Sequence, residues 1–398
     1  MNIREGILQD RAKRYVREYK PDLIGVIGST SVALTMKSIG LAMRSAHKTR
    51  VPIQPTVTVE DISKAILGLP LRKNISWWRL LLGSRLKEIA ETEPETIVIG
   101  TAPEYPGAID LIAKKYNWDV VVVTNVHSAH TRLFETKEAV AHEMLSLPIS
   151  VSKDKIVILN IDDMQTASMA EKINAKILTF GEHAKAIIRL VRAQRIPQGL
   201  GFIIEVKIKE ATYEISLPNI IARYQISSIL ASLATAYAME IDMKKAIAHV
   251  KHLTPPAGVM EKKPGKQGSI IIDDTLEATP EGVEDALKVL SVLPGKRKIA
   301  ILGEIDNLGA KAIEAHKKIG SSASEYAHVL VCTGPLMRHA QAVALEKGID
   351  THYFEDAQDI GKWFESYLAP EDVVLVKGGA HMHMESVVER LQKAKNKA

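Results

Sequence analysis

The sequence predicts an α/β protein with two domains, each built on parallel strands joined by helices. Short apolar runs alternate with helix-length amphipathic segments, which is typical of βαβ units. This alternation stops in a strand-rich stretch at 186–216 and starts again after the break Thr254-Pro255-Pro256-Ala257-Gly258. Because 398 residues exceed the usual size of one hydrophobic core, we expect domains at 1–254 and 255–398.

The first domain is expected to hold a parallel sheet with a small antiparallel subsheet. Its parallel strands are the apolar runs at 23–28, 97–100, 120–124, 156–160 and 177–180. In 186–216, three further runs are separated by connections too short for a crossover, which favours antiparallel pairing. Helices at 221–239 and 243–253 should complete this domain.

The second domain repeats the strand–helix alternation. Strands are expected at 270–274, 298–303, 328–334, 351–354 and 372–378. A helix should begin at Thr279-Pro280, because proline is favoured at the first helical position. The last helix is expected from about 382 to 395, and the charged segment 261–268 is predicted to be a surface turn.

Composition favours a cytoplasmic protein. Charged residues make up 25% of the chain and hydrophobic residues 46%, with a formal net charge of +5. That charge is modest and comes with no nucleic-acid-binding motif, so no nucleic-acid partner is expected. The single cysteine, Cys332, excludes an intrachain disulfide framework and fits a reducing compartment. We expect neither a signal peptide nor a membrane-spanning helix.

Residues 22–37, DLIGVIGSTSVALTMK, place a turn between a strand and a helix. A phosphate-binding loop occupies this setting, because the backbone N–H groups at a helix start attract anions. Its working form needs a lysine for the phosphates and a Ser or Thr hydroxyl for Mg²⁺. Here those places fall on Val32 and Ala33. The candidate loop residues are therefore Gly28, Ser29, Thr30 and Ser31, without the groups that neutralise a triphosphate.

Six segments, in this order, resemble sequence motifs of the Mur ligase superfamily. The resemblance is closest to the family's type that adds D-alanyl-D-alanine to a muramoyl tripeptide. They are TNVHSAH (124–130), LNIDD (159–163), LTFG (178–181), IIDDTLEATPEG (271–282), ILGEIDNLG (301–309) and VKGGAHMHMESVVERL (376–391). The resemblance implies a central P-loop-type domain followed by a Rossmann-like C-terminal domain. It also implies that the family's first domain, which binds the UDP end of the sugar nucleotide, is absent here.

The family activates a carboxylate with ATP and Mg²⁺ and lets an amine attack the acyl phosphate. Such chemistry needs preorganised cations around the phosphoryl group. Besides Val32 and Ala33, this chain departs where the resemblance places the metal-binding Glu (Gly100) and the carbamylated Lys (Met144). Further departures are at Pro55-Thr56-Val57-Thr58, Val259, Leu276, Glu277 and Thr279.

Several matching residues are retained. The resemblance makes His130 a candidate for catalysis or the second metal site and Lys377 a candidate for catalysis. Asn160 and Asp163, with the neighbouring Asp162, are placed to face an adenine or ribose, and Asp273 with Asp274 is kept in the C-terminal domain. Asp and Asn at strand ends also cap helices and close turns, so a purely structural role is the alternative interpretation.

Three functions are compatible with these residues. The first is a homologue with a decayed ATP site, which binds a cell-wall precursor or a wall-synthesis protein. The second is an active ATP- and Mg²⁺-dependent carboxylate–amine ligase, which would use Ser29, Thr30 and Ser31 on phosphates, Lys37 as a substitute cation, and Glu104 or His130 on the metal.

The third function is a membrane-surface adaptor. Segment 71–90, LRKNISWWRLLLGSRLKEIA, interleaves Trp and Leu with Arg and Lys, as helices in an anionic headgroup region do. The same pattern fits a helix packed on the sheet or docked on a partner. A soft-metal site at His381-Met382-His383-Met384 is not expected, because this sequence stands at a helix start.

Overall fold

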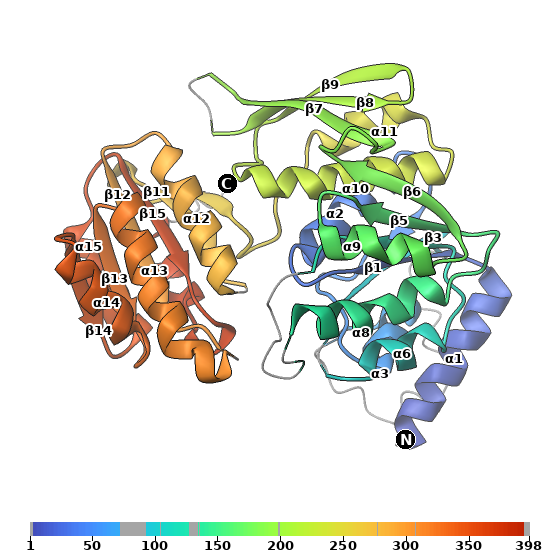
Figure 1. Ribbon diagram of the computed structural model, residues 1–398, viewed down its shortest axis with the longest axis horizontal. Coiled ribbons are helices and arrows are strands. Elements are labelled where there is room, and N and C mark those ends of the chain that lie inside the picture. The colour runs from blue at the N-terminus through green and yellow to red at the C-terminus, as the bar shows by residue number, and fades with distance from the viewer. Residues whose placement is uncertain are drawn as a thin grey trace. The chain divides into compact units, whose positions relative to one another are not determined.

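The computed structural model describes residues 3–71, 93–103, 105–126, 134, 136–197, 200–276, 278–306 and 308–393, and Figure 1 colours them along the chain. They form two compact units, which divide between Leu253 and Thr254. The short pieces Arg195–Phe202 and Pro218–Ala222 group with the second unit. None of the described helices is long and apolar enough to cross a membrane.

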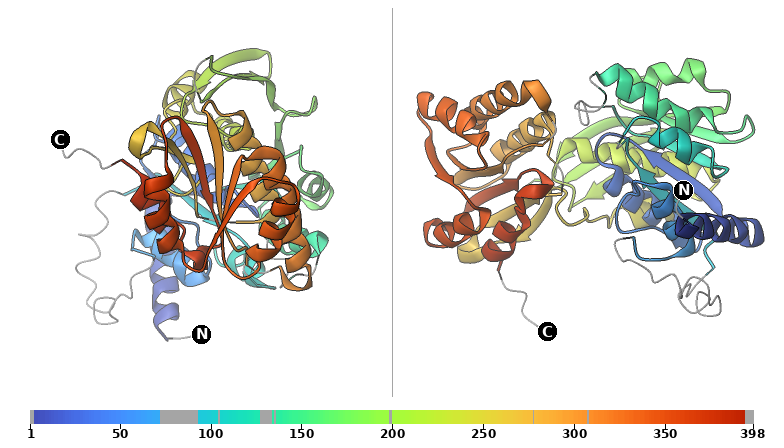
Figure 2. Two further views of the ribbon diagram at one scale, coloured as in Figure 1. Left: turned by 90° about the vertical axis from the view of Figure 1, so that its left-hand side faces the viewer. Right: turned by 90° about the horizontal axis from the view of Figure 1, so that it is seen from below.

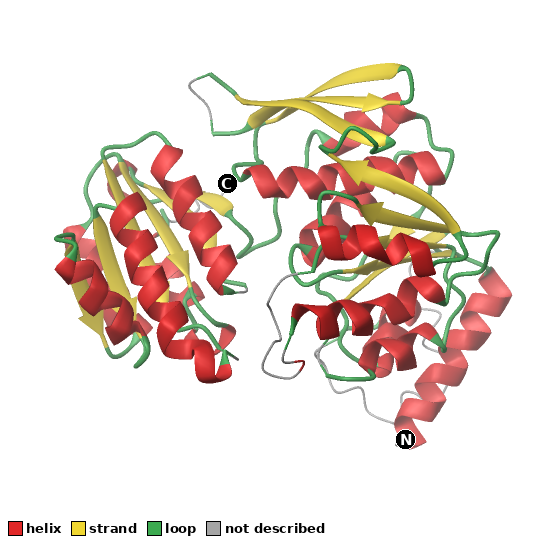
Figure 3. Cartoon of the chain, in the orientation of Figure 1, coloured by secondary structure: helices red, strands yellow, loops and turns green. Residues whose placement is uncertain are grey.

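The first unit is built on one sheet, whose strands are yellow in Figure 3. Across the sheet the strands are β2 (Thr49–Arg50), β3 (Thr96–Thr101), β1 (Asp22–Ile27), β4 (Val120–Val123), β5 (Ile156–Asn160), β6 (Lys176–Gly181), β7 (Ile188–Arg195), β8 (Phe202–Ile208) and β9 (Ala211–Leu217). Strands β2 to β6 pair in parallel. Because only Lys209 and Glu210 connect β8 to its neighbour β9, these two strands run antiparallel.

Helices cover both faces of this sheet. The buried cluster on one face draws side chains from four helices: α1 (Ile3–Tyr19), α3 (Val59–Leu67), α6 (Ala108–Ala113) and α8 (Lys137–Ile149). The short α9 (Met164–Ser168) and η1 (Met169–Lys172) lie alongside them. The opposite face carries α2 (Val32–Met43), α10 (Ile226–Ala238) and α11 (Met243–Val250), preceded by the turn η2 (Arg223–Gln225). The central strands are buried on both faces, which explains their continuous apolar runs.

Helix α2 is fixed to α10 by buried hydroxyl groups. Thr35 Oγ1 lies 2.8 Å from Ser228 Oγ, and Ser38 Oγ donates to Ser232 Oγ at 2.8 Å. All four side chains are buried. Because a buried hydroxyl without a partner is costly, these pairs define how the two helices align. The loop that precedes α2 is positioned by the same contacts.

The second unit contains a six-stranded sheet. Its strands lie in the order β10 (Glu261–Pro264), β11 (Ile270–Asp274), β15 (Asp372–Lys377), β12 (Arg297–Gly303), β13 (Val329–Thr333) and β14 (Asp350–Phe354). All pairings are parallel except that of β10 with β11. The expectation of a surface turn at 261–268 was therefore wrong for residues 261–264. They form a charged edge strand that ends at Pro264, a composition typical of sheet edges.

Two helix layers enclose this sheet, as the left view of Figure 2 shows. One layer holds α12 (Pro280–Val292), α13 (Ala312–Tyr326) and α14 (Met337–Glu346), and the other holds α15 (Ala357–Tyr367) and α16 (Glu385–Leu391). Short 3₁₀ turns are η3 (Lys266–Gly268), η4 (Gly309–Lys311) and η5 (Ala380–Met382). The last helix begins at Glu385, later than expected, because His383 has a φ of 49° and interrupts the helical path.

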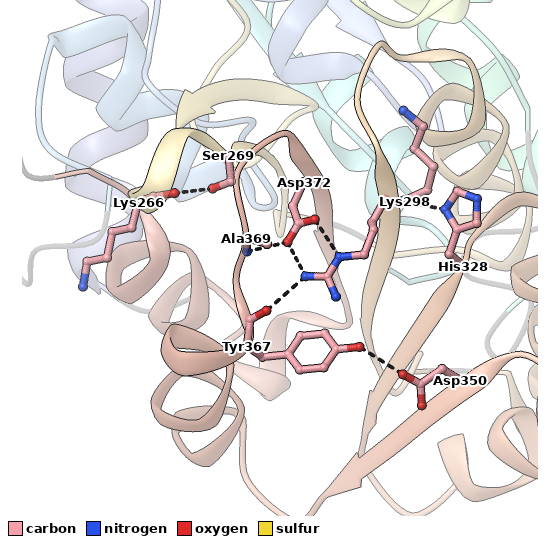
Figure 4. A network of polar contacts seen from close by, with 9 residues as sticks. Lys266, Ser269, Lys298, His328, Asp350, Tyr367, Ala369 and Asp372 are labelled. Carbon is pink, nitrogen blue, oxygen red and sulfur yellow. Dashed lines mark hydrogen bonds and ion pairs between the residues drawn. The ribbon is translucent and has the colours of Figure 1, made fainter.

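An ion pair fixes the amino ends of β12 and β15. Arg297 Nε and Nη2 donate to the Asp372 carboxylate at 2.8 and 2.6 Å, and Ala369 N also donates to it, as Figure 4 shows for Asp372. Arg297 Nη2 reaches the Tyr367 carbonyl as well, at 3.0 Å. Asp372 is only 1% exposed, so its charge depends on these donors.

We predict that Arg297→Ala lowers the free energy of unfolding of the second unit by about 3–5 kcal/mol, because it leaves a buried carboxylate without its cation. Urea titration of the full chain measures this change. Lys288→Ala is the matched control, since its partner Glu284 sits on an exposed helix surface and such pairs contribute about 1 kcal/mol or less. Equal losses in the two variants would contradict the prediction.

Candidate functional site

The candidate loop lies where β1 ends and α2 begins, at the carboxyl edge of the first sheet. Open α/β sheets bind ligands at this edge. Ser29 N donates to the Asn125 carbonyl at 3.1 Å, and Thr30 N donates to Asn125 Oδ1 at 3.0 Å. Thr30 Oγ1 and Asn125 Nδ2 are 3.1 Å apart. These hydrogen bonds attach the loop to Asn125, just after the end of β4.

The remaining loop residues keep the backbone path of a phosphate-binding turn. A β-carbon at Gly28 would overlap Thr124 Oγ1, so only glycine fits there. Ser31 has a φ of 61° and a ψ of 12°, in the left-handed region. The residue before the lysine of a phosphate-binding loop is glycine, which adopts such angles without strain. Serine occupies that place here and accepts the strain.

The first turn of α2 places apolar groups where the loop should supply charge. Val32 is 5% exposed and Ala33 is 9% exposed. A β-carbon on Gly100, at the end of β3, would overlap the Met36 sulfur and lie 2.6 Å from Val32 Cγ1. Val32, Met36 and Gly100, which we call the apolar plug, therefore fill one another's space. No side chain at residue 100 can reach toward the loop while Val32 and Met36 keep these positions.

Met144, which stands where the family resemblance places a carbamylated lysine, belongs to the core. It lies in α8 and is fully buried in the cluster shared by α3, α6 and β4. A lysine at this position would have to leave an apolar environment to reach any ligand.

Asn160, Asp162 and Asp163 form a turn after β5. Asn160 Nδ2 donates to the Thr124 carbonyl at 2.8 Å. The Asp162 carboxylate accepts the backbone N–H groups of Glu182 and His183, at 2.7 and 2.9 Å. Asp163 caps α9 through Thr166 N, at 2.8 Å. These contacts join the ends of β4, β5 and β6, and they give each residue a structural task beside any ligand.

Two ion pairs lie at the end of β11 in the second unit. Lys377 Nζ donates to Asp274 Oδ2 at 2.7 Å, and both side chains are buried. Lys263 Nζ donates to Asp273 Oδ2 at 2.5 Å. Burial alone would lower the pKa of Lys263, but the hydrogen bond and charge of Asp273 outweigh it and the pKa is raised.

In the segment His381–Met384, the histidine side chains and Met384 lie in different environments. Met384 is 1% exposed and packs beside Gly303, whereas His381 and His383 are exposed. His381 Nδ1 lies 2.5 Å from Asp306 Oδ2, and His383 Nδ1 lies 3.3 Å from Glu385 Oε1. In the described part of the chain, no three or more His, Cys, Asp or Glu side chains are grouped so as to hold a metal ion.

Several sequence candidates lie outside the described residues. They are His130, Glu104, Glu277 and all of the 71–90 segment except Leu71. Two residues important to the loop were missed by sequence reasoning. Asn125 was noted only as part of a motif, and Met36 was read as an ordinary helix residue. The contact of Met36 with Gly100 joins positions 64 apart in sequence, so no local pattern indicates it.

We predict that Ser31→Gly raises the free energy of unfolding of the first unit by about 0.5–1 kcal/mol, because it relieves the left-handed strain. Thermal and urea unfolding of the full chain measure this gain. Ser150→Gly is the control: Ser150 has a φ of −74°, so glycine there relieves no strain, adds unfolded-state freedom, removes the hydrogen bond from Ser150 Oγ to the Leu147 carbonyl and should destabilise. The prediction is wrong if Ser31→Gly behaves like Ser150→Gly.

Comparison with known proteins gives two family matches. Residues 78–236 match the Mur ligase middle domain, and residues 260–380 match the Mur ligase, glutamate ligase domain. The UDP-N-acetylmuramoyl-tripeptide–D-alanyl-D-alanine ligase of Bacillus subtilis is 25% identical over 392 residues, which are 96% of this chain and 79% of that protein. A UDP-N-acetylmuramoyl-L-alanyl-D-glutamate–2,6-diaminopimelate ligase of Listeria monocytogenes is 26% identical over 194 residues, 47% of this chain and 38% of that protein.

Solved structures share the fold. MurF from Acinetobacter baumannii aligns with a TM-score of 0.78 at 18% identity, over 98% of this chain and 80% of that one. MurF ligase from Thermotoga maritima, in complex with ADP, aligns with a TM-score of 0.76 at 20% identity, over 97% and 83%. With its parallel middle sheet and its second six-stranded sheet, this chain belongs to the Mur ligase family and carries the family's middle and C-terminal domains.

Proposed function

We propose that this chain is a Mur ligase homologue whose nucleotide site has decayed, and that it binds a ligand or partner without driving ATP turnover. The apolar plug is the observation that carries this proposal. It replaces the lysine and the metal-binding carboxylate of a working site with Val32 and Gly100, and it fills their space with Met36. One lost charge can be compensated by a neighbour, but packed apolar atoms also exclude the missing groups.

The energetic argument rests on the transferring phosphoryl group. Its charge must be held by preorganised cations, and a single oxyanion-type contact lowers the barrier by about 3–4 kcal/mol. A triphosphate brought against the buried Val32 and Ala33 side chains would lose solvation without gaining a cation. Asn125 holds the loop through groups other than the missing lysine and hydroxyl, so that attachment does not depend on them. Loss of the charged groups therefore leaves the fold intact.

The relatives indicate the setting in which such a homologue would act. Their names place them on UDP-N-acetylmuramoyl peptides, so the proposed ligand is a cell-wall precursor or a wall-synthesis protein. A cytoplasmic location is part of the same proposal.

We predict that the wild-type chain binds Mg·ATP too weakly to detect by isothermal titration. Val32→Lys/Ala33→Thr alone should restore little, because Met36 still blocks residue 100. The quadruple variant Val32→Lys/Ala33→Thr/Met36→Ala/Gly100→Glu rebuilds both charges and removes the obstruction, and it should bind in the micromolar range, an affinity of about 8 kcal/mol. The control replaces Val32 by Met in the quadruple variant, which keeps length but not charge.

Micromolar binding of Mg·ATP by the wild-type chain would overturn the proposal. The second candidate, an active ligase, would then be tested directly by phosphate release in the presence of amino acids or dipeptides. The similarity to a named ligase over 96% of this chain and 79% of that protein favours including that assay. Failure of the quadruple variant to bind, with its fold preserved by circular dichroism, would show that loss of charge and space is not the cause.

A further inference from the structure

His316 is a buried histidine in the second unit that no part of the proposed function uses. It lies in the second turn of α13 and is fully buried. Ile305 N, in the loop after β12, lies 3.2 Å from His316 Nε2. On the other side of the ring, Nδ1 lies 2.7 Å from the Ala312 carbonyl. The ring therefore joins the first turn of α13 to the end of β12.

These two contacts define the protonation state of the ring. A backbone N–H can only donate, so Nε2 must be the acceptor, and the Ala312 carbonyl can only accept, so Nδ1 must carry the proton. His316 is thus neutral, as one tautomer. A second proton could only be added at Nε2, where it would face the N–H of Ile305. Protonation and the Ile305 contact exclude each other.

The loop held by His316 carries other connections at the carboxyl edge of the second sheet. The Glu304 carbonyl accepts Gly379 N at 2.8 Å, and Glu304 Oε2 accepts Leu336 N at 2.9 Å. Asp306 holds His381, as described above. Residues 304–306 therefore join the turns that follow β13 and β15. Release of Ile305 from His316 would therefore also weaken the contacts made by Glu304 and Asp306.

The surroundings of the ring favour its neutral form. Burial lowers the pKa of His316; the Ala312 hydrogen bond and the Glu304 charge oppose this shift, and His339 on α14 adds to it.

We propose that His316 is an acid-sensitive latch: its neutral ring holds loop 304–306 closed, and protonation of the ring releases that loop before the second unit unfolds. The released segment would include Asp306, so the contact with His381 opens in the same step. The carboxyl edge of the second sheet is then closed at neutral pH and open in acid.

Hydrogen exchange of the full chain, followed by mass spectrometry from about pH 7.5 to about pH 5, tests the latch. After correction for intrinsic exchange rates, a peptide spanning 301–306 should lose protection on acidification, by up to about tenfold per pH unit as the pH falls from about 6.5 toward the folded pKa. A peptide spanning β14 reports global unfolding of the same unit and should keep its protection over this range.

Two variants separate the latch from simple packing. His316→Gln retains an acceptor that does not titrate, so protection of 301–306 should become independent of pH. His316→Leu removes the acceptor, so protection should be low at every pH. His249→Gln, at an exposed histidine in the first unit, is the control and should behave as wild type. Simultaneous loss in both peptides, or a wild-type pH response in His316→Gln, would overturn the latch.

A stability measurement gives an independent check with a defined sign. Because the folded pKa of His316 is depressed, its contribution to stability is present above about pH 6.5 and is lost as pH falls through the folded pKa. The free energy of unfolding of the wild-type chain should therefore fall below about pH 6.5 relative to His316→Gln. A constant difference between the two proteins across this range would count against the latch.

Discussion

The contact between Thr30 and Asn125 is the constraint on which the middle-domain site depends. It attaches the loop after β1 to the end of β4 through backbone and side-chain hydrogen bonds. The loop is therefore attached to the sheet by groups other than the charged groups of a phosphate site. Once shape and charge are supplied by different residues, the charged residues can be lost while the turn persists, even with Ser31 in a left-handed conformation.

The packing of helix α2 links the loss of one charged group to the loss of the others. Thr35 and Ser38 attach α2 to α10, so a shift of α2 that made room at residue 100 would break these buried hydrogen bonds. Val32 and Met36, on the same helix, occupy the space of any side chain at residue 100. Restoring one charged group thus requires a change at the others, because close-packed interiors tolerate little added volume.

The sequence predicted the elements whose signals are local. Apart from the two-residue β2, which was missed, the parallel strands were found to within about two residues, because strands buried on both faces read as continuous apolar runs. Strand β10 was missed, because its charged sequence Glu-Lys-Lys-Pro resembles a loop and its pairing with β11 has no apolar run to indicate it. The strand and helix on either side of the candidate loop were predicted from the sequence. The packing of Met36 against Gly100 is a tertiary contact that no hydrophobic periodicity indicates.

The second unit shows why retained charged residues are weak evidence for catalysis. Asp274 and Lys377 form a buried pair, and removing such charges from water costs free energy that only further hydrogen bonds offset. Asp274 supplies one of these bonds itself: its Oδ1 accepts Met260 N at 3.0 Å and thereby holds a residue with a φ of 47°. The pair thus fixes the start of the second unit, just after the division at Leu253. A residue with that task would persist whether or not the site beside it performs chemistry.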